Sequence, residues 1–372
     1  MINEEADLNN KKNSYKRRKN LNYIAFLKFL AMIIIIRWHC VPWTEFKIDY
    51  GARMCEFLFV SSGFLVGYNY YKRPMPSTYQ SSIKYAYKHL RIFYPLELIN
   101  ILYFLCIYRY KFKITYIEII LINFFLLKSW AMSAAIRFFN GVSWFYSALI
   151  LCYFLTPFLL GGIKNLKISL ILFTSVAIIR FSAEEFVFRK GVNVLKIDFH
   201  YGPVIRTMEF FLGMLMVPLY YKIKSYIDII SNLLLNKITF TIIQIELPIY
   251  LYYLMEKYNG IFHRGKFVLI FCLFTFISAF DYGYLSKIVK IKLFKIIMSC
   301  QMEMYMLQIL VPHIIKKILL INNWDFSQNI ELLFYIKLFC IFLFAFIYKN
   351  SFKAQLAYIM DATVYFIIKN LN

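Results

Sequence analysis

Three ionisable side chains lie in the first long apolar block of the sequence, which runs from Leu21 to Val41: Lys28, Arg37 and His39. An ionisable group at the centre of a membrane-length segment costs about 2.5–3.5 kcal/mol on insertion scales, so it indicates function by default. In a helix, Lys28 and His39 point within about 20° of each other and stand about 16 Å apart along the axis. The imidazole has the chemistry of a general base because it titrates near neutral pH. One helix face therefore combines a cation with a candidate base.

The same residues also have a purely structural interpretation. Lys28 would extend its long side chain to the nearer membrane interface. His39 would lie in the headgroup region at the other end of the helix, beside Trp38 and Trp43. Arg37 points about 160° away from His39 and so belongs to another face. Both interpretations remain open on these residues alone.

The second apolar block begins with Glu56 and continues through Ser62 and Gly63. A lone carboxylate in lipid is unfavourable, so we expect Glu56 to pair with a cation of the first block. Small residues such as Ser62 and Gly63 let two membrane helices approach closely, and this packing role is commoner than catalysis.

A basic run with Lys84, Lys88, His89 and Arg91 follows and ends at Pro95. Cations at a membrane surface would bind a phosphate-rich ligand. They would equally serve as ordinary topology signals on the cytoplasmic side. The seven cysteines are spread singly and show no CxxC spacing, so no metal site is expected.

The segments that must position these residues are apolar and long. Hydrophobic residues make up 61% of the 372 residues and charged residues only 17%. A bilayer core about 30 Å thick needs roughly 20 apolar helical residues to cross it. Apolar blocks of about this length fall near 22–41, 53–71, 92–110, 114–128, 143–161, 168–182, 203–222, 238–255, 266–284, 294–315 and 330–349. They predict an all-α, polytopic transmembrane helical bundle of about ten or eleven spans in a single domain.

The charge pattern divides the chain into three parts. Residues 1–20 form a basic tail, which the positive-inside bias places in the cytoplasm. Residues 21–349 form the transmembrane domain, and 350–372 a short C-terminal tail. The net charge of +23 does not indicate nucleic-acid binding, because the basic residues lie between apolar blocks, where they contact lipid headgroups.

Several segments match a known pattern in order and spacing. They are residues 27–31 followed by His39, residues 56–64, residues 91–95, Trp144-Phe145, residues 209–213, and Ser299 with residues 305–307. In this order they resemble the motifs of the bacterial acyltransferase-3 family of membrane proteins, over almost the whole chain. Lys28 replaces the usual arginine of that family, which keeps the charge but loses the bidentate fork. Gln308 stands where a histidine often follows.

The resemblance implies a membrane-bound O-acyltransferase of the bacterial cytoplasmic membrane. Members of the family transfer an acyl group, usually acetyl from acetyl-CoA, to a hydroxyl of a cell-surface polysaccharide such as capsule, O-antigen or exopolysaccharide. It implies catalytic roles for His39, Lys28 and Glu56. It further implies that Arg91, Lys88 and Lys84 bind the CoA phosphates, with no metal cofactor and with a surface or lipid-linked glycan as acceptor.

Two other functions remain alternatives. A glycan flippase, a polymerase or another polytopic transporter would explain the span count. Against it, the ionisable groups within the blocks concentrate in the first third of the chain, whereas a transporter should carry them along many spans. An enzyme that acylates a peptide, a lipid or an antibiotic is not separated from a glycan acylase by the sequence. The oligomeric state is not determined by these residues.

Overall fold

The computed structural model describes residues 21–40, 50–73, 75–108, 115–131, 139–190, 201–230, 234–257, 265–324 and 329–371. These residues form helices and connecting turns, with no strand among them, so the predicted all-α helical bundle is confirmed. The basic segment 1–20 lies outside the described residues, and its role as a tail stays a prediction.

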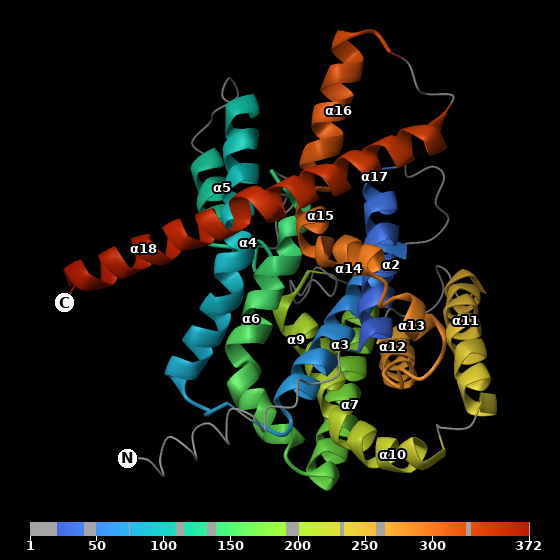
Figure 1. The fold of residues 1–372 in the computed structure, drawn as a ribbon. Coiled ribbons are helices and arrows are strands. Elements are labelled where there is room, and N and C mark those ends of the chain that lie inside the picture. Colours follow the sequence, from blue (N-terminus) through green and yellow to red (C-terminus); the bar gives the residue numbers. More distant parts are fainter. Residues whose placement is uncertain are drawn as a thin grey trace, which may run out of the picture.

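Within the described residues, the helices follow one another along the chain without any sheet between them (Figure 1). In chain order they are α2 (Asn22–Cys40), α3 (Tyr50–Tyr70), α4 (Tyr79–Tyr108), α5 (Thr115–Phe124), η4 (Gly141–Ser143), α6 (Trp144–Leu159), η5 (Leu160–Ile163), α7 (Leu166–Lys190), α9 (Pro203–Leu215), α10 (Val217–Ile230), α11 (Leu234–Lys257), α12 (Gly265–Ser278), α13 (Leu285–Ile288), α14 (Lys292–Ser299), α15 (Gln301–Leu307), α16 (Leu310–Ile321), α17 (Ile330–Ile347), the π-helical turn η6 (Tyr348–Phe352) and α18 (Lys353–Leu371).

Seven described helices are long and apolar enough to cross a membrane, or eight if the bent pair α15 and α16 counts as one span. The protein is therefore a multi-pass membrane protein, with fewer such helices in its described part than the ten or eleven expected. Helix α3, in block 53–71, has 21 residues but is not among these candidate spans, and two other blocks give short helices. Block 114–128 contains the 10-residue α5, and block 266–284 contains the 14-residue α12. At 1.5 Å per residue, both are shorter than a bilayer core of about 30 Å.

Helix α3 is the centre of the bundle. Every residue from Met54 to Phe64 is buried, and the helix packs against α2, α9 and α12. A helix that is buried on all sides needs neighbours on all sides. This central position explains why polar side chains on α3 must find partners inside the protein.

Two glycines set the close contact between α3 and α9. A Cβ added at Gly63 would overlap the Phe210 carbonyl, and one added at Gly213 would overlap the Val60 carbonyl. Gly67, one turn after Gly63, lies against Met214, so the two helices run parallel. Small residues four apart allow this backbone approach in membrane bundles, which confirms the packing role expected for Gly63.

The block 294–315, expected as one span, is broken into three helices. α14 ends at Ser299, α15 begins at Gln301, and α16 is bent by 49° from α15. A break leaves backbone carbonyls without helical partners. The amides of Asn100 and Asn140 both lie 3.4 Å from the Met306 carbonyl and donate to it there.

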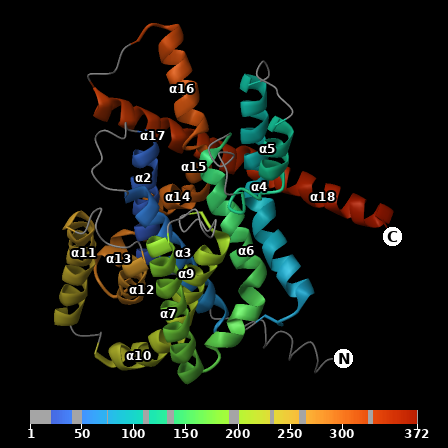
Figure 2. The same cartoon turned by 180° about the vertical axis from the view of Figure 1, so that it is seen from behind.

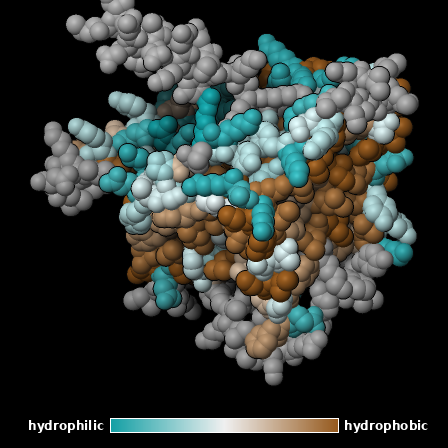
Figure 3. Space-filling view, turned by 90° about the horizontal axis from the view of Figure 1, so that it is seen from below, coloured by the Kyte–Doolittle hydropathy of each residue, from teal (hydrophilic) through white to brown (hydrophobic). Residues whose placement is uncertain are grey.

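The C-terminal residues 330–371 form one long rod, α17–η6–α18, that crosses the other helices (Figures 1 and 2). The segment expected as a short tail is thus helical and packs along α4. Figure 3 shows hydrophobic side chains over much of the face seen from below, with hydrophilic ones gathered toward one side. This surface suits contact with lipid acyl chains.

Candidate active site

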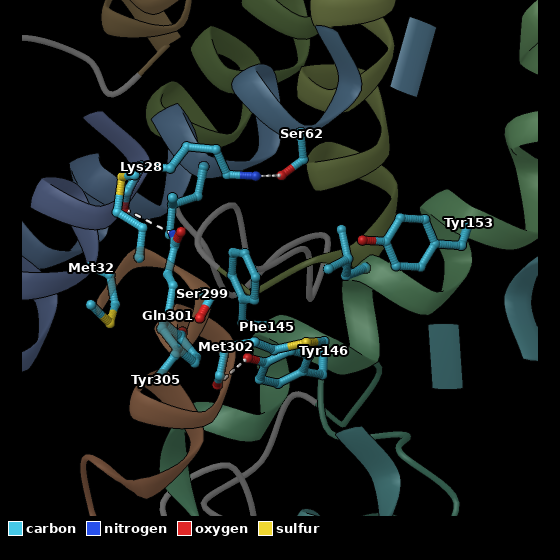
Figure 4. Close-up of a pocket in the computed structure, with 13 residues that line it drawn as sticks. Lys28, Met32, Ser62, Phe145, Tyr146, Tyr153, Ser299, Gln301, Met302 and Tyr305 are labelled. Carbon is cyan, nitrogen blue, oxygen red and sulfur yellow. Dashed lines mark hydrogen bonds between the residues drawn. The ribbon is translucent and has the colours of Figure 1, made fainter. Parts of the chain in front are cut away.

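A cavity of about 260 Å³ lies between α2, α3, α6 and the broken segment α14–α15 (Figure 4). It contains one charged side chain, Lys28, among hydroxyl, amide, thioether and aromatic groups. Its lining residues are Lys28, Met32, Leu58, Ser62, Phe145, Tyr146, Leu149, Tyr153, Met298, Ser299, Gln301, Met302 and Tyr305. The cavity thus brings together segments from four different apolar blocks.

Lys28 is held at both its backbone and its side chain. Its Nζ donates to the Ser62 hydroxyl at 2.9 Å, and its carbonyl accepts from the Gln301 side-chain amide at 3.0 Å (Figure 4). None of the lining residues is acidic, so the cavity has a positive charge without a carboxylate in its wall. An ammonium group has three donors, and Ser62 accepts one of them. This arrangement suits a ligand oxygen that is negative or becomes negative during reaction.

His39 lies in the last turn of α2, where it is exposed, and it does not line the cavity. Helix α2 is continuous over Lys28 and His39, so the two residues share a face but remain about 16 Å apart along the axis. Arg37 points elsewhere and pairs with Glu331 of α17. The two predicted catalytic residues of α2 therefore occupy different ends of one helix face.

Glu56 belongs to a buried ion network that crosses three helices. The network consists of Arg53 and Glu56 of α3, Arg180 and Glu184 of α7, and Arg206 and Glu209 of α9. Glu209 is its centre: Arg180 Nη2 donates to Oε1 at 3.0 Å, and Arg206 Nη1 donates to Oε2 at 2.6 Å. Three positive and three negative groups balance each other, which makes their burial possible.

The prediction that Glu56 pairs with a cation of the first apolar block is wrong. Glu56 pairs with Arg53 of its own helix at 3.6 Å, while Lys28 bonds to Ser62 and Arg37 to Glu331. Antiparallel packing explains this: Gly51 lies against Trp38 and Ser62 against Lys28, so the part of α2 at the level of Glu56 is the apolar stretch between Lys28 and Arg37. Glu56 is about 9 Å from Ser62 along α3 and lies between the levels of Lys28 and His39.

The network also includes residues that were not expected from the sequence. Arg180 and Arg206 are 1% exposed and Glu184 is 8% exposed, so buried charge in the described residues does not concentrate in the first third of the chain. The signal was present, because Arg180 lies in block 168–182 and Arg206 in block 203–222. The Arg206 guanidinium lies over the rings of Phe59 and Trp144. These two residues are the sequence neighbours of Leu58 and Phe145, which line the cavity.

The predicted donor-binding residues share one face of α4. Lys84, Lys88 and Arg91 follow a spacing of four and three residues, and both lysines are exposed. About 130° around the helix from this basic face, the His89 ring stacks on Tyr153, with ring centroids 4.0 Å apart. Because Tyr153 lines the cavity, this stack joins the inward side of α4 to the cavity wall, while the basic face points away from it.

Arg91 forms an ion pair with Asp361 of α18, and Asp361 also accepts from the Tyr87 hydroxyl at 2.8 Å. The Arg91 side chain is still 41% exposed, so part of its guanidinium faces outward. Among the described residues, no group of three or more His, Cys, Asp or Glu side chains is arranged to hold a metal ion.

The fold and the site define a multi-pass helical membrane protein with a cation in a cavity between its helices. Comparison with known proteins identifies the family. A family model described as an acyltransferase domain matches residues 21–350. The chain therefore belongs to this family, the acyltransferase-3 family whose motifs it resembles, and family membership supports an acyltransferase activity. No curated protein and no solved structure matches the chain.

Proposed function

We propose that the protein transfers an acetyl group from acetyl-CoA to a hydroxyl of a cell-surface polysaccharide, at the bacterial cytoplasmic membrane. The observation that carries the proposal is the Lys28 cavity, which lies within the family-matched region and whose wall is packed through the His89–Tyr153 stack against α4, the helix that carries the basic face. A helix with an exposed cationic face, packed beside a cavity that contains one half-buried cation, fits a donor with phosphates at one end and a thioester at the other.

The chemistry divides between donor and acceptor. Lys88, Lys84 and Arg91 would bind the CoA phosphates, and the Lys28 ammonium would stabilise negative charge on the thioester oxygen. The acceptor oxygen attacks the thioester carbonyl, the C–S bond breaks, and CoA leaves as a thiolate. His39 would take the proton of the acceptor hydroxyl.

Lys28 and His39 are about 16 Å apart along α2, so they cannot both contact one reacting group in this conformation. A general base acts only within hydrogen-bond reach of the proton that it removes. The acetyl group or α2 must therefore move between the two levels during turnover. A structure with bound acetyl-CoA would measure that movement directly.

The test is acetylation of the surface polysaccharide in a deletion strain that expresses wild type, His39→Ala or Lys28→Met. Both variants should abolish acetylation while the protein remains in the membrane. Controls of the same residue types are His313→Ala and Lys317→Met on α16, neither of which lines the cavity. Full acetylation by the His39→Ala protein would remove His39 from the mechanism.

Purified protein supplies the second half of this test. Wild type in nanodiscs should bind CoA and release it from acetyl-CoA when the acceptor is present. Absence of CoA binding, together with unflipped lipid-linked glycan in cells lacking the protein, would overturn the proposal in favour of a transporter. Acetyl-CoA turnover with unchanged glycan would instead indicate a peptide, lipid or antibiotic acceptor.

A further inference from the structure

Helix α18 lies beyond the family-matched region, which ends at residue 350, and yet it contacts two parts of the candidate site. Through Lys353 it reaches Glu303 of α15, and through Asp361 it reaches Arg91 of α4. One helix thus touches both the segment that forms a cavity wall and the face expected to bind the donor.

The cavity wall at α14–α15 needs external support because it is a broken helix. Met298 and Ser299 end α14, Gln301 and Met302 begin α15, and all four line the cavity. Such a break is tolerated within a membrane bundle only where surrounding protein satisfies the freed backbone groups. The positions of these wall residues therefore depend on contacts from other helices.

Two of these contacts come from the C-terminal rod. Lys349 Nζ, in the π turn η6, donates to the Ser299 carbonyl at 2.6 Å, and Lys353 pairs with Glu303. Glu303 is 3% exposed, so its carboxylate is buried and Lys353 supplies the compensating charge. π-Helical turns inside longer helices occur frequently at functional sites.

The other contact of α18 lies on the basic face of α4, which is expected to bind the acyl donor. Asp361 is the only acidic residue of α18, and it accepts from Arg91 Nη1 and from the Tyr87 hydroxyl. A guanidinium has five N–H donors, so a bond from Nη1 orients the group and leaves donors for a phosphate. Lys353 and Asp361 are about 12 Å apart along the helix, which lets a single rigid rod span both contacts.

We propose that α18 positions the acyl-transfer site, with Lys353 holding the cavity wall through Glu303 and Asp361 orienting Arg91 toward the donor phosphates. The inference rests on the proposed acyl-CoA function and assigns it two positioning residues outside the family-matched region. The two residues are expected to have different effects. Asp361 acts on the affinity for the acyl donor, and Lys353 acts on the turnover rate.

The experiment compares full-length Asp361→Asn, Lys353→Met and Lys353→Arg in nanodiscs. Asp361→Asn should weaken CoA binding and raise the KM for acetyl-CoA about tenfold, with kcat near wild type, because a charge-assisted contact that orients Arg91 is lost. Lys353→Met should lower kcat about tenfold with CoA affinity near wild type, and Lys353→Arg should restore kcat by keeping the charge. Asp228→Asn on α10 and Lys317→Met on α16 are the matched controls and should behave as wild type.

Each outcome decides the inference. Unchanged or tighter CoA binding by Asp361→Asn would show that Asp361 does not orient Arg91 for the donor. The activity of Lys353→Met could fall only in proportion to its folded fraction, and Lys353→Arg could fail to restore it. That result would show that Lys353 has only a structural role. If wild type neither binds CoA nor releases it from acetyl-CoA, the proposed function itself fails. If wild type does both and the α18 variants match it, only the role of α18 fails.

Discussion

At the scale of single residues, charge burial is the main constraint on this protein. Lys28 is stabilised by a hydroxyl and by its place in a cavity, whereas Glu209 is stabilised by two arginines. A cation bonded to neutral groups can still interact with a ligand, while a fully paired carboxylate is already neutralised. This contrast distinguishes the cation of the candidate site from the charges of the ion network.

The buried ion network gives a prediction for Glu209→Ala. Removing Glu209 leaves Arg180 and Arg206 with an uncompensated charge, and breaking a buried pair costs about 3–5 kcal/mol. We expect loss of a folded, monodisperse protein in detergent, measured by size-exclusion chromatography after a temperature series. The control is Glu331→Ala, which removes the exposed partner of Arg37 and should leave the thermal transition unchanged. A Glu209→Ala protein as heat-stable as wild type would contradict this account of the network.

At the scale of helices, the α3–α9 contact fixes the position of Ser62, and through it that of Lys28. The Gly63–Phe210 and Gly213–Val60 contacts bring the two backbones together directly beside Ser62. Any increase in the α3–α9 distance would therefore shift one wall of the cavity. Stability and site geometry depend here on the same pair of glycines.

Gly63→Ala tests this dependence. The new methyl group would overlap a backbone carbonyl, which cannot move as a side chain would, so the cost should exceed the 1–3 kcal/mol or so of ordinary overpacking. We expect a lower thermal transition and a lower acyl-transfer rate. Gly161→Ala is the matched control, because its added Cβ would meet nothing within 4 Å. Equal transition temperatures for the two variants would show that α3 and α9 separate without penalty.

At the scale of the whole molecule, the orientation in the membrane would assign the two ends of α2 to two compartments. The positive-inside bias predicts a cytoplasmic N-terminus, and α3 runs antiparallel to α2. Under the proposed function, Lys28 would then lie toward the compartment that supplies acyl-CoA and His39 toward the compartment that holds the surface glycan.

Cysteine labelling tests this orientation. In a background in which the seven native cysteines are replaced, Tyr50→Cys at the start of α3 and Arg73→Cys after its end provide one probe at each side. In intact cells whose outer layers admit the reagent to the cytoplasmic membrane, a membrane-impermeant maleimide should label position 50. It should label position 73 only in inverted membrane vesicles. Labelling of both positions from the same side would exclude α3 as a span and would leave the compartment of His39 unassigned.

The sequence by itself determined the helical membrane class, the family resemblance and the shared face of Lys28 and His39. These features depend on apolar block length and helical period, which are local properties of the chain. Tertiary structure decided the rest: that Ser62 and Gln301 hold Lys28, that Glu56 pairs with Arg53 beside Glu209, and that α18 reaches both Glu303 and Arg91. These contacts join residues far apart in sequence, and they follow from the rotation and depth at which helices pack, which periodicity along one helix does not specify.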